Sequence, residues 1–267
     1  GLKGKNRSFI EKNLVNNLKD CLSRNKIDFG YIRRQRGRIF IDSNRESTSL
    51  LKNVFGISSL SYAEEVGLDM KSIQAVVSRL VSHSEFENFR ISVQRLNKEF
   101  SLSSMELEKE LGAFVVEKFG KKVKLEQPEL NIQIEIADKA YIFNERIQGF
   151  GGLPIGTQGK VVCWINNSKS LLAAILMMRR GCKVVLAGRM LKVNGFGKYN
   201  YGSILEFYPA GSFKEVEEIA SRLKIKAIVV DHTLKDYAKL DSQMLVLRPL
   251  IAFSEKDIEL QREKYFG

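Results

Sequence analysis

Residues 161–187 read VVCWINNSKSLLAAILMMRRGCKVVLA, and this stretch decides the fold of the C-terminal part of the chain. Val161–Ile165 and Lys183–Ala187 are apolar runs with the length of buried strands. Between them, the polar loop Asn166–Ser170 leads into an apolar run that predicts a helix ending at Gly181. Strand, helix and strand at this spacing predict a small doubly wound domain with a parallel sheet.

The segments on both sides of this stretch also carry structural signals. Ser212 with Glu215 predicts the start of another helix, and the apolar run 227–230 predicts a further strand. On the amino-terminal side, residues 149–156 (GFGGLPIG) hold four glycines and one proline. This composition predicts a linker or tight turn between domains.

The first 65 residues predict a compact α+β module. Ser8 and Glu11 have the spacing of a capping box, and apolar residues every four positions predict a helix over 8–23. The strand-like runs 29–32 and 38–41 flank Gln35-Arg36-Gly37 and predict a β-hairpin. A short helix near 46–54 and a strand near 58–65 follow.

The middle of the chain predicts a second α+β module. Asp69 starts a helix with one apolar face, residues 89–93 alternate as a strand, and Ser103 with Glu106 makes a capping box before another helix. Two further alternating runs around residues 137–139 predict a second hairpin.

Composition excludes several classes of protein. The longest notable apolar run, 171–178, is eight residues, whereas a membrane span needs roughly 20. No signal-like segment opens the chain, and Cys21, Cys163 and Cys182 are too far apart for a disulfide framework, so we expect a cytoplasmic protein. With two histidines in the chain, no zinc site of the usual spacing can form, and we expect no metal site.

Charge is unevenly distributed along the chain, whose net charge is +12. Residues 1–50 hold 12 Lys and Arg against 5 acidic residues, residues 51–160 hold 14 against 15, and residues 161–267 hold 17 against 11. Basic ends indicate a polyanionic partner, either nucleic acid or an acidic membrane face. A soluble protein with a high net positive charge and no such partner would have the same numbers of basic and acidic residues.

Three basic clusters are candidate nucleic-acid contacts, before the first helix, around the first hairpin and after the strand at 89–93. Their residues are Lys3, Lys5, Asn6 and Arg7, then Arg33, Arg34, Arg36 and Arg38, then Arg95, Lys98 and Phe100. Four arginines within six residues repel one another unless a polyanion neutralises them, which favours RNA or DNA contact at the hairpin. A solvated charge run is the favoured interpretation of the first cluster taken alone, and Phe100 either stacks on a base or packs into the core.

The loop of residues 166–170 lies where doubly wound folds bind phosphates. It contains no glycine to let backbone amides approach an anion, and no Walker-type motif occurs in the chain. Lys169 and Ser170 remain able to hold one phosphate, but a plain polar connection is the favoured interpretation. Asp231-His232 after a strand is interpreted as a loop pair, and Cys163 as a small buried side chain.

Four stretches occur in an order typical of a known family. They read GLKGKNR at 1–7, GFGGLPIGTQ at 149–158, MMRRGC at 177–182 and RPLI at 248–251. They resemble the tRNA 4-thiouridine sulfurtransferase family. The resemblance implies a ferredoxin-like domain over 1–60, an RNA-binding THUMP domain over 61–150 and a reduced PP-loop-like α/β domain over 151–267.

The resemblance also implies a role in tRNA modification. In the family, the first two domains bind the acceptor region of tRNA, the PP-loop domain uses ATP to activate a uridine, and a cysteine persulfide supplies sulfur. The family's phosphate loop reads Ser-Gly-Gly-x-Asp-Ser, but only Ser170 matches in Ile165-Asn166-Asn167-Ser168-Lys169-Ser170. The chain also has no cysteine beyond Cys182, where the family has its persulfide cysteine.

These departures lead to three hypotheses. The favoured one is a tRNA-binding protein, without catalytic residues or a cofactor, that contacts the acceptor region through one continuous track of the basic clusters. Its nucleotide-binding loop (Asn166, Asn167, Ser168, Lys169 and Ser170) would be vestigial. The alternative is an active, divergent ATP-dependent sulfurtransferase making 4-thiouridine. The third is an interaction module that forms a homodimer or recruits a catalytic partner protein.

Overall fold

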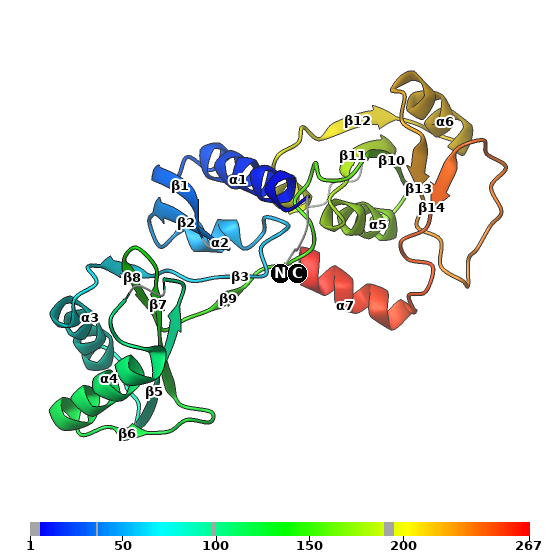
Figure 1. Cartoon of the computed structure of the whole chain (residues 1–267). Coiled ribbons are helices and arrows are strands. Elements are labelled where there is room, and N and C mark those ends of the chain that lie inside the picture. Colours follow the sequence, from blue (N-terminus) through cyan, green and yellow to red (C-terminus); the bar gives the residue numbers. More distant parts are fainter. Residues whose placement is uncertain (1–5, 36, 98–99, 190–194) are drawn as a thin grey trace. The chain divides into compact units, whose positions relative to one another are not determined.

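The computed structural model describes residues 6–35, 37–97, 100–189 and 195–267. The chain forms two compact units (Figure 1): one joins Gly1–Ser59 to Gln148–Gly267, and the other is Leu60–Ile147. The division into three domains at residues 60 and 150 stays a prediction. Four predicted contact residues, Lys3, Lys5, Arg36 and Lys98, lie outside the described residues.

The N-terminal segment of the first unit contains a long helix, a hairpin and a short helix, as predicted. These are α1 (Arg7–Arg24), β1 (Phe29–Gln35), β2 (Arg38–Ser43) and α2 (Ser47–Leu51). In the antiparallel hairpin, Arg33 is paired with Phe40 and Arg34 with Ile39. Because neighbouring residues of a strand point to opposite faces, Arg33 and Arg34 lie on different faces of the hairpin.

The predicted capping box at the start of α1 is wrong. The helix begins at Arg7, and the side chain of the preceding Asn6 makes no capping hydrogen bond. The Glu11 carboxylate accepts a hydrogen bond from Arg7 Nε at 2.7 Å. An arginine one turn away on the same helix has therefore taken the carboxylate that a capping box would direct to the backbone.

The C-terminal part of the first unit is the doubly wound domain that the sequence predicts. Its elements are β10 (Lys160–Ile165), α5 (Ser168–Arg179), β11 (Lys183–Gly188), the 3₁₀ helix η1 (Phe196–Tyr199), β12 (Glu206–Pro209), α6 (Phe213–Arg222), β13 (Ala227–Val229), β14 (Leu245–Leu247) and α7 (Glu255–Phe266). The five strands are all parallel, in the order β12–β11–β10–β13–β14.

Side chains of the central strand β10 pack into a hydrophobic core on each face of the sheet. Val161, Cys163 and Ile165 pack into the core that contains α5 and α7 residues, whereas Val162 packs into the core on the α6 side. A continuous apolar run is what a strand covered by helices on both faces requires.

Helix α1 packs against the C-terminal domain (Figure 1). The Asn17 side chain, 2% exposed, donates a hydrogen bond to the Ile155 carbonyl at 3.1 Å. Further along the helix, Arg24 donates to the Asn200 carbonyl at 2.9 Å. Phe55, which follows α2, stacks on Tyr199 with ring centroids 5.6 Å apart. The N-terminal segment and the C-terminal domain therefore share one packed interior.

The glycine-rich stretch 149–156 makes tight turns, as predicted, but it is not a linker that stands apart from the units. Gly151 donates to the Ile57 carbonyl at 2.8 Å, and Leu153 donates to the Arg179 carbonyl at 2.9 Å. At Gly152, φ is +82° and a Cβ would lie 2.2 Å from the Arg179 carbonyl oxygen. Only glycine fits there, since the backbones approach too closely for any side chain.

The second unit is a mixed five-stranded sheet with two helices. Its elements are β4 (Glu64–Val66), α3 (Met70–Ser82), β5 (Asn88–Arg95), α4 (Ser104–Phe119), β6 (Lys122–Val123), β7 (Leu130–Ile136) and β8 (Ala140–Phe143), with strand order β4–β8–β7–β5–β6. The predicted caps are confirmed: Asp69 accepts from the Ser72 amide, and Ser103 with Glu106 forms a complete capping box.

The chain passes between the units at two short strands, β3 (Ser59–Leu60) and β9 (Ile147–Gln148), which pair with each other. The single strand predicted near 58–65 is thus two, β3 and β4. Among the described residues, no helix is long and apolar enough to span a bilayer.

Candidate nucleic-acid interface and nucleotide loop

The start of α1 and the first hairpin come together around one carboxylate. Glu11 accepts from Arg7 Nε at 2.7 Å, and its other oxygen lies 3.6 Å from Arg34 Nη1. The same Arg34 nitrogen lies 3.5 Å from the Ser8 carbonyl. The two arginine side chains stay 48% and 43% exposed. We call Arg7, Glu11 and Arg34 the arginine pair site; it presents two cations and one carboxylate to solvent.

A glycine in the hairpin turn lets the Arg7 side chain come close to the hairpin. Gly37 has φ +83°, and a Cβ there would lie 3.3 Å from Arg7 Nη2. On the other face of the hairpin, the Arg33 guanidinium lies 5.1 Å from the Tyr31 ring centroid and 5.4 Å from that of Phe40. Cation–π contacts with two rings reduce the repulsion that four neighbouring arginines would otherwise have. Arg38, in β2, is half-buried.

The third predicted cluster belongs to the second unit. Arg95 ends β5, and its Nε lies 3.4 Å from the Asn97 carbonyl. Phe100 is half-buried and packs against the hydrophobic core of that unit. Core packing was one of the two interpretations of this residue, and its contact with RNA stays a prediction.

The loop after β10 binds its own backbone. Asn167 Oδ1 accepts from the amides of Lys169 at 2.7 Å and Ser170 at 3.1 Å. Ser170 Oγ accepts from the amides of Asn166 at 3.0 Å and Asn167 at 3.1 Å. The Ser170 side chain is 2% exposed, so these bonds are shielded from water. Four amides that a phosphate loop would offer to its ligand are thus satisfied by side chains of the loop itself.

The one cation of this loop is also occupied. Lys169 Nζ forms an ion pair with Asp236, which also accepts from the Thr233 amide and hydroxyl. The Lys169 ammonium, with help from Thr233, holds the pKa of Asp236 well below its usual range. No local sequence pattern indicates this pair, because its members are 67 positions apart in the chain.

The Asp231-His232 pair follows β13, the strand beside β10, as expected for a polar pair at the carboxyl ends of strands. Within the described part of the chain, Asp231 Oδ2 and His232 Nδ1 are buried without a hydrogen-bond partner.

The three cysteines are free and buried. Burial raises the pKa of the Cys21 thiol to about 11 and strongly raises that of Cys163. It also raises the pKa of Cys182. Because the thiolate is the reactive form, none of the three is activated as a nucleophile.

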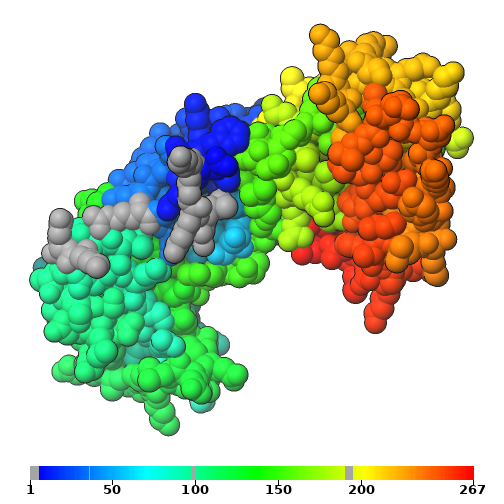
Figure 2. Space-filling view, turned by 45° about the vertical axis from the view of Figure 1, so that its right-hand side comes forward, coloured from blue at the N-terminus to red at the C-terminus, as the bar shows by residue number. Residues whose placement is uncertain are grey.

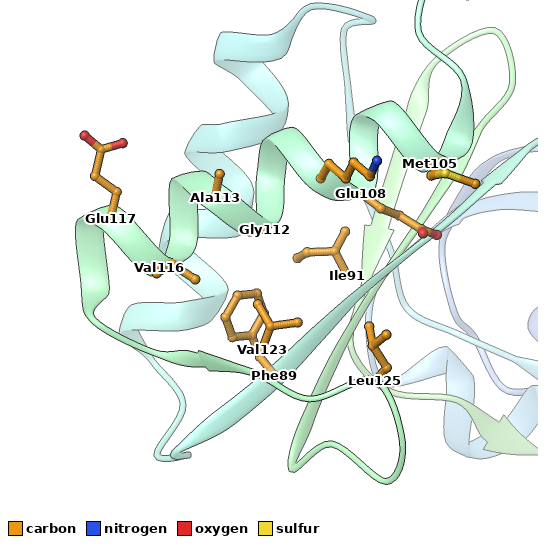
Figure 3. A pocket seen from close by; sticks show the side chains of 11 residues that line it. Phe89, Ile91, Met105, Glu108, Gly112, Ala113, Val116, Glu117, Val123 and Leu125 are labelled. Atoms are coloured by element: carbon orange, nitrogen blue, oxygen red, sulfur yellow. The ribbon is translucent and has the colours of Figure 1, made fainter.

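An apolar groove of about 670 Å³ lies in the second unit beside α4 (Figure 3). Phe89 and Ile91 of β5, together with Val123 and Leu125, face the helix across it. Gly112 leaves it open, since a Cβ there would meet no atom within 4 Å. Of the three predicted basic clusters, none of the residues that the structure describes lines it.

Two sequence families match the chain. Residues 1–61 match the ThiI ferredoxin-like domain, and residues 68–145 match the THUMP domain. The chain is also similar to proteins named probable tRNA sulfurtransferase: it is 35% identical to that of Thermococcus kodakarensis over 220 residues, covering 75% of this chain and 58% of the relative. For Natranaerobius thermophilus, identity is 37% over 201 residues, covering 69% and 48%. The chain thus spans about half the length of the curated relatives it matches.

Solved structures share the fold. The crystal structure of PH1313 from Pyrococcus horikoshii superposes with a TM-score of 0.86 at 31% identity, covering 99% of this chain and 95% of that one. A 4-thiouridine synthetase in complex with RNA and ATP gives a TM-score of 0.81 at 21% identity, covering 98% and 82%. The predicted fold class, a ferredoxin-like domain, a THUMP domain and a doubly wound α/β domain, is confirmed. The chain belongs to the THUMP-containing tRNA sulfurtransferase family.

Proposed function

We propose that this protein binds the acceptor region of tRNA and that its C-terminal domain does not use ATP for sulfur transfer. The tRNA contacts come from the three basic clusters of the ferredoxin-like and THUMP domains. The protein then contributes RNA binding to a tRNA-modification process whose chemistry is performed elsewhere.

The observation that carries the second half of this proposal is the self-bonded loop after β10. Asn167 and Ser170 satisfy four amides of the loop, and Asp236 neutralises Lys169. A triphosphate would have to displace all of these bonds. Breaking each of these bonds costs free energy. A glycine-rich phosphate loop avoids this cost, because its amides already point toward the ligand.

The cysteines support the same conclusion. A persulfide relay needs an accessible thiol of low pKa, whereas Cys163 and Cys182 are buried with raised pKa values. The alternative, an active divergent sulfurtransferase, would therefore need a sulfur donor other than these cysteines as well as a rebuilt loop.

The RNA-binding half rests on charge and exposure. Arg7 and Arg34 keep nearly half of their side-chain surface exposed, and arginine forks match phosphate geometry. The relatives are named for tRNA sulfurtransfer, and a solved structure of the same fold contains RNA. tRNA is accordingly the polyanion that best fits this surface.

Two measurements test the proposal. Isothermal calorimetry with ATP and Mg²⁺ at millimolar concentration should give no binding heat, and saturable heat would favour the active sulfurtransferase. In a gel-shift experiment at about 50 mM salt, where phosphate contacts are strong, the protein should shift tRNA. Failure to shift tRNA would refute the RNA-binding half.

A further inference from the structure

Three lysines form a row at the amino-terminal edge of the parallel sheet in the C-terminal domain. Lys160 begins β10 and Lys183 begins β11, and the two are paired in register. Val162 of β10 is paired with Ile228 of β13, so Lys226, two positions before Ile228, is level with Lys160. Adjacent strands are about 4.8 Å apart, so the three Cα atoms fall within about 10 Å. We call Lys183, Lys160 and Lys226 the lysine row.

Two of the three lysines of the row, Lys183 and Lys226, have no acidic partner among the described residues. Lys183 and Lys226 are exposed, and within the described residues neither takes part in an ion pair or a side-chain hydrogen bond. Lys160 pairs with Glu206 of β12 at 2.7 Å, and this bond, with one from Tyr208, lowers the pKa of Glu206. Like charges on directly neighbouring strand positions destabilise a sheet. Three lysines in register therefore indicate a surface that meets an anion.

One end of the row, Lys183, lies near α1, the helix that carries Arg7 and Glu11. Gly156 lies between them: a Cβ there would be 3.1 Å from Asn13 Oδ1 and 3.4 Å from Lys183 Cε. Asn13 comes six residues after Arg7 on α1, a rise of about 9 Å along the helix. The space-filling view shows the blue residues of α1 against the green residues of the C-terminal domain (Figure 2). Within the first unit, Arg34 of the hairpin and Lys183 of the lysine row thus both lie near α1.

The lysine row lies at the opposite edge of the sheet from the loop Asn166–Ser170. The loop Asn166–Ser170 and Asp236 lie at the carboxyl ends of the strands, and Lys160, Lys183 and Lys226 lie at the amino ends. Nucleotides of doubly wound folds bind at the carboxyl ends. The lysine row is therefore separate from that site, and the loss of a working loop leaves it intact.

We propose that the lysine row binds the phosphodiester backbone of the same RNA that contacts the arginine pair site. This proposal rests on the proposed function. It gives the C-terminal domain a role as a third RNA-contacting surface, in which Lys183 and Lys226 contact phosphates directly. Lys160 exchanges Glu206 for a phosphate, which costs little because an exposed ion pair is only weakly stabilising.

The test compares tRNA binding by fluorescence anisotropy across a salt series for the full chain and four variants. The triple variant Lys160→Ala/Lys183→Ala/Lys226→Ala removes the row, and Arg34→Ala weakens the arginine pair site. Lys214→Ala is the matched control, an exposed lysine of α6 near the opposite edge of the sheet. Glu206→Gln removes the competing carboxylate. Melting temperatures of all variants establish that they are folded.

Each lost phosphate contact should make the slope of log K against log[salt] shallower by about 0.7–0.9, equivalent to about fivefold to eightfold weaker binding at 0.1 M salt. The triple variant should lose at least two such contacts, Lys214→Ala none, and Glu206→Gln should tighten binding.

Other outcomes would overturn the proposal. If the triple variant binds tRNA like the native chain while Arg34→Ala is weakened, the lysine row is not an RNA contact and the proposed function stands. If the native chain binds no tRNA, both the lysine-row proposal and the RNA-binding part of the proposed function are refuted. If the triple variant loses binding to vesicles containing anionic lipid but keeps its tRNA affinity, the row serves a membrane surface instead.

Discussion

Asn167 and Ser170 cap each other: the Asn167 side chain accepts from the Ser170 amide at 3.1 Å, and the Ser170 hydroxyl accepts from the Asn167 amide at 3.1 Å. In a phosphate-binding loop, the ligand satisfies such amides. Here the loop contains its own acceptors, and α5 starts as a capped structural helix. A site that is complete without a ligand gains little by binding one.

The caps should matter for stability. Replacing Asn167 with Ala removes the acceptor for two amides and should lower the free energy of unfolding by about 1 kcal/mol. Urea denaturation measures this change. Asn166→Ala is the matched control, since only its backbone bonds to Ser170, and it should change the free energy by less than about 0.5 kcal/mol. Equal effects of the two substitutions would contradict the capping role.

The Lys169–Asp236 pair predicts a pH dependence. Because the folded state lowers the pKa of Asp236, its stabilising contribution is present above the unfolded-state value of about 3.9 and is lost as pH falls through the lowered value. The contribution is about 1 kcal/mol or less, since the Asp236 side chain is 48% exposed.

Comparing the native chain with Asp236→Asn across pH 2–7 tests this dependence. The difference in unfolding free energy should be constant above about pH 5 and shrink below about pH 4. A difference that grows as the pH falls would contradict the ion pair.

Most secondary structure could be predicted because local signals and tertiary packing agree. The apolar run at β10 and the capping pairs at Asp69 and Ser103 predicted their elements correctly. The error at Ser8 and Glu11 had a local and a tertiary cause. Glu11 bonds to Arg7, one helical turn earlier, at a spacing that is visible in the sequence. Its second contact, with Arg34 of the hairpin, has no local pattern.

The candidate site was predicted less completely than the fold, because contacts between residues far apart in the sequence leave no local pattern. The absence of glycine from the loop is visible in the sequence, but the pairing of Lys169, after β10, with Asp236, after the neighbouring strand β13, is not. The lysine row does have a sequence signal: Lys160, Lys183 and Lys226 each stand directly before an apolar run. Their register becomes evident only from the strand pairing.

Phe100 provides a test of packing against stacking. Because it packs on the core of the second unit, Phe100→Ala should destabilise that unit by about 2 kcal/mol, less than a fully buried Phe would cost. Phe100→Leu should restore most of the stability. Thermal denaturation and tRNA binding are measured on both. If Phe100→Leu is stable yet loses about 1–3 kcal/mol of RNA affinity, the ring stacks on a base.

The arginine pair site should act through charge. Arg34→Ala should weaken tRNA binding about fivefold to eightfold at 0.1 M salt and make the salt slope shallower by about 0.7–0.9, because one phosphate contact is lost. Arg34→Lys should keep the slope. Lys256→Ala, an exposed lysine on α7, serves as the control and should have no effect. A native-like slope for Arg34→Ala would remove this residue from the interface.

The salt dependence of tRNA binding by the native chain tests the central claim most directly. With about five phosphates contacted, log K should fall with log[salt] at a slope of about −3.5 to −4.5 between 50 and 200 mM, and more steeply when the lysine row is also engaged. Saturable binding with such a slope, unchanged by millimolar ATP, is the predicted result. Absence of binding at 50 mM salt, or a slope near zero, would contradict an RNA-binding surface built from these cations.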